Sequence, residues 1–184
     1  GWNKSMWWTE GQLENLNNIL VKLKQHYNID ENRVHLAGMS DGGTGVYDVA
    51  NAQSTPWASF FPYLANIAGL NALSSRQMYA SNLTNRPFLV VNAENDEVFP
   101  PKIVRPFITL LRKAKVNLDF QMIKGAAHNM EWFPKVKSKV IEFINQQVRN
   151  PYPDRLYWET ETVDKHHHIH WLQVDALTET AEKS

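Results

Sequence analysis

Gly38-Met39-Ser40-Asp41-Gly42 is the stretch of sequence that decides the fold. It has the form G-x-S-x-G and lies between a short apolar run at 33–37 and a small-residue stretch at 42–52. The run predicts a buried strand, and the stretch predicts a helix packed closely beneath it. A serine on such a strand-to-helix turn projects its Oγ above the sheet, and glycines let the neighbouring backbone approach. The alternative is an ordinary glycine-rich turn with an incidental serine.

A serine hydroxyl is a poor nucleophile until a base takes its proton. His128 is the candidate base, because it follows an alternating strand predicted at 116–122 and a loop of small residues at 125–127. The alternative is a surface histidine. The N–H of Asp41, at the predicted helix N-terminus, is the candidate donor to an oxyanion.

The acid that orients such a histidine should follow a strand between the two. Asp96 does so, because residues 87–91 form the clearest predicted strand and a polar stretch ends it. Glu94 and Glu97 are neighbours, and either could be the orienting acid while Asp96 caps a turn. The chain order serine, aspartate, histidine is one of the orders in which Ser-His-Asp triads occur.

Predicted strands and helices alternate along the chain, which favours an α/β fold with a parallel sheet and helices on both of its faces. Thr9 opens the first helix in a capping box that Gln12 completes. We expect residues 1–150 to form the α/β domain, and residues 151–184 to form a β-hairpin appendage followed by a polar tail. Strands are predicted at 33–37, 64–70, 87–91, 116–122, 156–162 and 169–174, and helices at 9–27, 42–52, 101–115 and 136–148.

Composition excludes several classes of function. Of the 184 residues, 43% are apolar, and no apolar run approaches the length of a membrane span. Lys+Arg and Asp+Glu are both 19, and a zero net charge argues against a general nucleic-acid binder. The absence of cysteine excludes disulfides and thiolate metal sites, and leaves the compartment open. The chain does not open with the basic and then apolar pattern of a signal peptide.

Three segments carry a family resemblance: residues 28–43 (NIDENRVHLAGMSDGG), residues 92–100 and residues 125–128. They closely resemble the elbow, acid loop and histidine loop of esterases related to polyhydroxyalkanoate depolymerases and feruloyl or acetylxylan esterases. The resemblance covers about residues 9–148. It implies an α/β-hydrolase fold, hydrolysis of small or polymeric esters without cofactor or metal, and catalytic roles for Ser40, Asp96 and His128. It slightly favours an extracellular or periplasmic location.

The sequence departs from that family at its front. Members normally have several strands before the elbow, whereas this chain begins one helix upstream of it, so we expect the N-terminal strands of the three-layer sheet to be missing. The elbow strand would then have a free edge, which soluble proteins avoid. We expect this edge to be covered by a second copy in a homodimer, by the missing N-terminal portion, by the segment Trp7-Trp8 or by the C-terminal hairpin.

Three aromatic residues and three histidines are further candidates for binding. Trp57, Phe99 and Trp132 lie in loops or near motif ends and are candidates to wall a substrate pocket, although packing of the helix–sheet interface explains each equally well. His166, His168 and His170 would share one face of a strand, but an ordinary exposed strand is the favoured interpretation over a metal site.

Two rival functions remain open at this point. The first is a serine peptidase or amidase with the same triad, since prolyl-oligopeptidase-type peptidases share the same core. The second is a non-catalytic binding module on a hydrolase scaffold. Substrate panels separate the first from an esterase, and labelling by a fluorophosphonate excludes the second.

Overall fold

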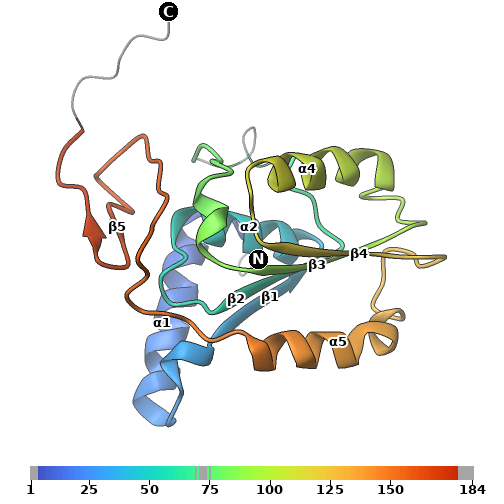
Figure 1. The fold of residues 1–184 in the computed structure, drawn as a ribbon, viewed down its shortest axis with the longest axis horizontal. Coiled ribbons are helices and arrows are strands. Elements are labelled where there is room, and N and C mark those ends of the chain that lie inside the picture. The colour runs from blue at the N-terminus through green and yellow to red at the C-terminus, as the bar shows by residue number, and fades with distance from the viewer. Residues whose placement is uncertain (1–3, 69, 71–73, 75, 178–184) are drawn as a thin grey trace, which may run out of the picture.

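The computed structural model describes residues 4–68, 70, 74 and 76–177 and contains a four-stranded sheet in the order β1-β2-β3-β4 (Figure 1). All three pairings are parallel, as the alternating pattern predicted. The strands are β1 (His35–Met39), β2 (Ser59–Tyr63), β3 (Phe88–Ala93) and β4 (Leu118–Ile123).

The second strand is not where the sequence placed it. The prediction of a strand at 64–70 is wrong, because β2 ends at Tyr63 and Leu64 turns the chain with a φ of 46°. Pro62 has no N–H and is rare inside a central strand, so the pattern of residues 59–63 did not indicate one. The pairing of β2 with β3 is correspondingly interrupted, with partners at Phe60 and Tyr63.

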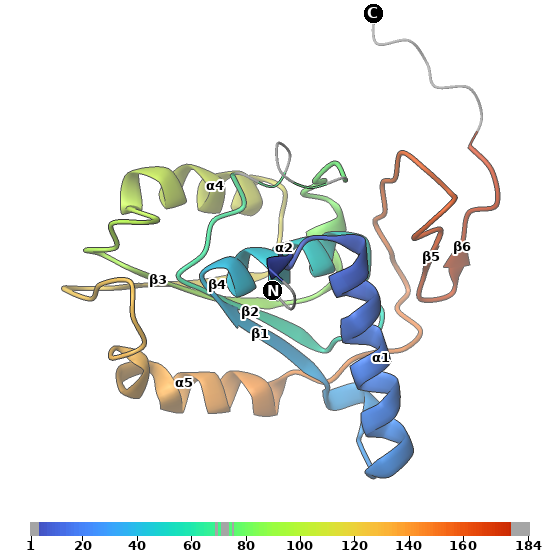
Figure 2. The ribbon, with the colours of Figure 1, turned by 180° about the vertical axis from the view of Figure 1, so that it is seen from behind.

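Helices cover both faces of the sheet, which gives three layers (Figures 1 and 2). On one face, α2 (Asp41–Ala52) and α4 (Pro101–Lys113) pack against Phe88 and Val90 of β3. On the other, α5 (Phe133–Gln146) packs against Leu89 and Val91. This alternation along β3 is the period of two that a strand buried on both faces requires.

Helix α1 (Glu10–His26) joins the α2 face of the core through Leu13 and Leu20. Thr9 is its N-cap residue, as predicted, but the capping box is wrong. The Thr9 hydroxyl donates to the Met6 carbonyl instead, and no side chain caps the helix. None of the described helices is long and apolar enough to cross a membrane.

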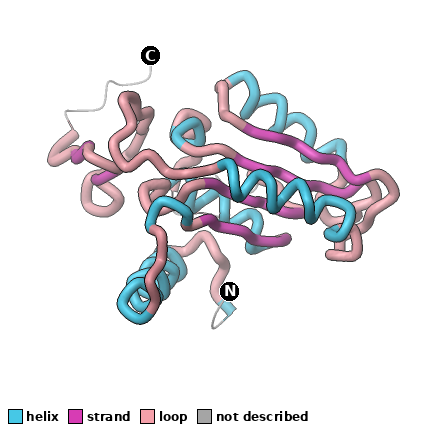
Figure 3. The backbone as a smooth tube through the Cα atoms, turned by 60° about the horizontal axis from the view of Figure 1, so that its bottom comes forward, coloured by secondary structure: helices cyan, strands magenta, loops and turns pink. Residues whose placement is uncertain are grey.

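The outer edge of β1 has no strand partner among the described residues. Trp7 and Leu16 lie along it and, with Leu36 to Met39, line a cavity of about 390 Å³. The expectation that the C-terminal hairpin covers this edge is wrong, because β5 (His168–Ile169) and β6 (Leu172–Gln173) pair with each other in a separate antiparallel sheet. Figure 3 shows these two short strands at one end of the molecule, apart from the four strands of the main sheet.

The C-terminal arm, residues 151–177, contains no strand at 156–162, so that prediction is also wrong. This segment is extended, but its backbone bonds to two side chains of the 3₁₀ helix η3 (Asn82–Asn85). The Asn82 amide donates to the Glu159 carbonyl (2.9 Å) and accepts from the Glu159 N–H (2.7 Å). Asn85 does the same with Tyr157, at 2.7 and 3.0 Å. Two asparagines thus replace a partner strand. The domain boundary at residue 150 stays a prediction.

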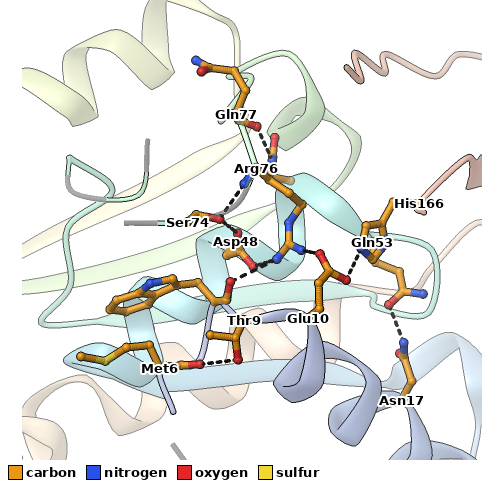
Figure 4. A network of polar contacts seen from close by, with 12 residues as sticks. Met6, Thr9, Glu10, Asn17, Asp48, Gln53, Ser74, Arg76, Gln77 and His166 are labelled. Atoms are coloured by element: carbon orange, nitrogen blue, oxygen red, sulfur yellow. Dashed lines mark hydrogen bonds and ion pairs between the residues drawn. The ribbon is translucent and has the colours of Figure 1, made fainter. Parts of the chain in front are cut away.

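A buried ionic network ties the arm to the core (Figure 4). Arg76 forms ion pairs with Glu10 of α1 and Asp48 of α2. Glu10 also bonds to Nε2 of His166, at 2.9 Å. His170 contacts Arg86 instead, so the histidines predicted to share one face have separate partners. In the part of the chain that the structure describes, no cluster of three or more His, Asp or Glu could hold a metal ion.

Candidate active site

Ser40 occupies the turn between β1 and α2 with φ 56° and ψ −122°, a conformation that costs free energy for a residue with a Cβ. Two hydrogen bonds hold it there: its N–H donates to the Tyr63 carbonyl, and the Thr44 N–H donates to its carbonyl, both at 2.9 Å. Two glycines make room, because a Cβ on Gly38 would lie 2.2 Å from the Gly42 oxygen, and one on Gly43 would lie 2.7 Å from the Tyr63 oxygen. The turn is therefore strained and held by its neighbours.

His128 and Asp96 reach Ser40 from the ends of neighbouring strands. Nε2 of His128 lies 2.9 Å from Oγ of Ser40, and Nδ1 lies 2.8 Å from Oδ2 of Asp96. The three sequence-predicted residues are thus brought together in one hydrogen-bonded row. Because a carboxylate can only accept, Nδ1 carries the proton, and the lone pair of Nε2 faces the serine hydroxyl.

The carboxylate of Asp96 is fully buried and is held by two backbone N–H groups. Its Oδ1 accepts the N–H groups of Val98 (2.9 Å) and Phe99 (2.8 Å), which leaves Oδ2 for His128. The rival acids take no such part. Glu94 accepts the Gly125 N–H at 2.9 Å, and Glu97 is exposed.

Asp41 is the first residue of α2, directly after Ser40. The first N–H groups of a helix have no acceptor within it, and the helix dipole places partial positive charge there. Its N–H is therefore placed to donate to a developing negative charge beside Oγ, and its role in an oxyanion hole stays a prediction.

The profile of the dienelactone hydrolase family matches residues 3–139, more than half of the chain. The chain belongs to the dienelactone hydrolase family. No curated protein matches the sequence.

Solved structures with the same fold include esterases and a peptidase. A thermostable esterase is 23% identical with a TM-score of 0.63, over 77% of this chain and 38% of that chain. An acylaminoacyl peptidase is 16% identical with a TM-score of 0.62, over 79% and 28%. Esterase PE8 is 14% identical with a TM-score of 0.55, over 73% and 61%. This dienelactone hydrolase family chain spans less than two thirds of each of them, and the likeness shows its α/β-hydrolase fold.

The predicted substrate-binding aromatics lie in three different places in this family member. The ring of Phe99 is 5.9 Å from that of His128, centre to centre, and is half-buried beside the candidate triad. Trp132 is buried, with its ring packed edge-on against Tyr63 and Phe133.

Trp57 is not brought to the candidate triad. It is buried in the core just before β2, at the amino end of a strand whose carboxyl end meets Ser40. The amino and carboxyl ends of the strands lie at opposite ends of a parallel sheet, so a side chain at the amino ends cannot line a pocket at the carboxyl ends.

Sequence reasoning missed Tyr63 and Gly43, which hold the Ser40 turn through backbone contacts. A backbone carbonyl leaves no signature in a sequence. Gly43, one residue beyond the G-x-S-x-G pattern, was visible as part of the small-residue stretch but carried no separate signal.

Proposed function

We propose that this protein is a serine hydrolase that cleaves carboxylic esters through an acyl-enzyme, with Ser40 as nucleophile, His128 as base and Asp96 as its orienting acid. The observation that carries the proposal is the unbroken row from Asp96 through His128 to the Ser40 hydroxyl. Membership of the dienelactone hydrolase family and the esterase neighbours support it.

In the acylation step, the Ser40 oxygen bonds to the ester carbonyl carbon while its proton passes to Nε2 of His128. The buried carboxylate of Asp96 stabilises the imidazolium that forms. The oxyanion of the tetrahedral intermediate accepts the Asp41 N–H. The intermediate then expels the alcohol, which takes the proton from His128, and water repeats the sequence to release the acid.

The substrate is expected to be a small or polymeric carboxylic ester of the kind cleaved by feruloyl and acetylxylan esterases or polyhydroxyalkanoate depolymerases. Phe99 lies beside His128 and is proposed to contact the substrate at the carboxyl ends of the strands. Another cavity, of about 350 Å³, lies between the core and residues 158–166 of the arm, away from the candidate triad.

A serine peptidase or amidase is the second candidate, because the acylaminoacyl peptidase has nearly the same TM-score as the thermostable esterase. An ester and an amide of the same acyl group distinguish the two. Both classes cleave the ester, because it is the more reactive acyl donor, but only a peptidase or amidase also turns over the amide at a measurable rate.

The direct test is covalent labelling with a fluorophosphonate, followed by identification of the labelled peptide. Ser40 should carry the label in the wild-type protein and in Ser138→Ala, which removes an exposed serine of α5. Ser40→Ala should take up none. A protein that is folded and remains unlabelled would instead support a non-catalytic binding module.

A further inference from the structure

The acid loop, residues 92–100, is joined to the end of β4 and to the histidine loop, residues 125–128, by three hydrogen bonds. The Glu94 N–H donates to the Ile123 carbonyl at 3.0 Å, and the Asn95 N–H donates to the Ala126 carbonyl at 2.8 Å. The third bond runs the other way, from the Gly125 N–H to Oε2 of Glu94 at 2.9 Å. The first two bonds are made by backbone alone, so only the third depends on the identity of a side chain.

That third bond is made where the histidine loop changes direction. Gly125 follows β4 with a φ of 68°, in the left-handed region that favours glycine. His128 is three residues further along, and Asp96 is two residues from Glu94. One carboxylate is therefore fixed to the turn that carries the candidate base and is nearly adjacent to the candidate acid.

We propose that Glu94 is a positioning residue: by holding the Gly125 N–H it sets the separation of His128 Nδ1 from Asp96 Oδ2. Its role for turnover rests on the proposed function, but its effect on His128 does not. Glu94 touches no reacting atom, since both nitrogens of His128 are occupied by Asp96 and Ser40. It acts through the loop, where displacement of a catalytic group by a fraction of an ångström slows a reaction.

The size of the effect follows from the setting of the bond. A hydrogen bond to a charged group stabilises more than a neutral one, but Glu94 is exposed and water competes for it. Loss of the side chain should therefore lower kcat about fivefold, with KM nearly unchanged, because the ground-state binding surface stays the same.

Three variants of the full chain test this. Glu94→Ala removes the acceptor, and Glu94→Gln keeps an oxygen that can accept from Gly125 while it removes the charge. Glu97→Ala is the matched control, because Glu97 is an exposed carboxylate of the same loop. Ester turnover gives kcat and KM, and the low-field NMR signal of the proton between Nδ1 of His128 and Oδ2 of Asp96 reports the strength of that hydrogen bond directly.

We expect Glu94→Ala to lower kcat about fivefold and to move the signal of the shared proton upfield, because a longer bond to Asp96 is a weaker one. Glu94→Gln should restore both, and Glu97→Ala should match the wild type. Equal shifts of the signal in Glu94→Ala and Glu94→Gln would assign the effect to charge and overturn the proposal. A wild-type signal in Glu94→Ala would also overturn it.

The NMR result separates this proposal from the proposed function. If Ser40→Ala retains full activity while the signal of the shared proton still moves in Glu94→Ala and recovers in Glu94→Gln, the positioning role stands and the assignment of the nucleophile fails. If Ser40→Ala is inactive and the signal is unmoved by Glu94→Ala, the nucleophile stands and the positioning role fails.

Discussion

Gly38 and Gly42 meet across the turn that carries Ser40, but only one of them requires the absence of a side chain. A Cβ on Gly38 would lie 2.2 Å from the Gly42 carbonyl oxygen and 2.4 Å from its carbon. A Cβ on Gly42 would meet nothing within 4 Å outside its own helix. The two glycines of one sequence motif therefore have different physical reasons to be there.

Gly38→Ala should accordingly be damaging and Gly42→Ala should not. The first forces backbone apart at a turn that cannot move without Ser40, at a cost of about 3 kcal/mol or more. The second adds a methyl group to a helix with open space around it, which should stabilise by about 0.5–1 kcal/mol. Urea unfolding of both variants measures the difference. Equal loss of stability in the two variants would contradict this account of the turn.

Ser40→Ala should remove nearly all hydrolysis of p-nitrophenyl esters while leaving the fold intact. The hydroxyl is the group that the geometry presents to His128, and loss of a triad nucleophile lowers kcat by roughly a thousandfold or more. Initial rates report the loss, and circular dichroism reports the fold. An unchanged rate would remove Ser40 from the mechanism.

Amide substitution of the three carboxylates of the acid loop should lower kcat to clearly different extents. Asp96→Asn replaces the buried acceptor at Nδ1 of His128, so it should reduce kcat by orders of magnitude, as loss of the orienting acid does in known triads. Glu94→Gln and Glu97→Gln should stay close to the wild type, because an amide can still accept from Gly125 and Glu97 is exposed. If Glu97→Gln is the slowest of the three, the orienting acid has been assigned to the wrong residue.

His170 should make stability depend on pH. Burial, with help from the nearby charges of Arg86 and Arg149, lowers the pKa of His170 from 6.5 to about 4 in the folded protein. As the pH falls, the unfolded chain therefore takes up the proton before the folded protein does. The stability that neutral His170 contributes is fully present above pH 6.5 and is lost between pH 6.5 and 4.

With allowance for solvent screening, about 2 kcal/mol should be lost over that interval. The measurement is the free energy of unfolding of the wild type and of His170→Gln, which cannot titrate, from pH 8 to pH 4. The His170→Gln curve should be flatter over the lower half of this range. Parallel curves for the two proteins would show that this histidine does not control the loss.

The sequence predicted the candidate site better than the fold around it. Ser40, Asp96 and His128 each follow a strand, and in a parallel sheet all such positions converge on one edge, so their meeting needed no tertiary knowledge. Strand β2 was not predicted because Pro62 interrupts its pattern. The apolar residues after it have the composition of a strand and were predicted as one instead. A periodicity argument cannot distinguish these two cases.

The C-terminal arm was predicted poorly for a different reason. Its extended segment is held by Asn82 and Asn85, more than 70 residues earlier in the chain, through amide-to-backbone bonds that no local pattern encodes. The position of Trp57 was mispredicted for a similar reason. Whether an aromatic residue in a loop faces a site or the core depends on which end of the strand it lies beside.

The outer edge of β1, with Trp7 and Leu16 alongside it, offers, among the described residues, unpaired backbone groups for self-association. Ser40 donates its N–H to Tyr63 of β2, and alternate residues of a strand face opposite neighbours, so the backbone groups of His35, Ala37 and Met39 point away from the sheet. Among the described residues no strand pairs with them. We propose that two copies pair along this edge around a two-fold axis, which makes one continuous sheet.

A charge on that edge should prevent the pairing, because lysine on edge strands is a common device against strand addition. Ala37→Lys places one at an exposed position of β1 without altering the face that bonds to β2. Ile141→Lys, at an exposed position of α5, is the control for added charge and lost apolar surface. Sedimentation equilibrium should show a dimer for the wild type and for Ile141→Lys, and a monomer for Ala37→Lys. If all three proteins sediment as monomers, or Ala37→Lys dimerises like the others, the two copies do not meet at β1.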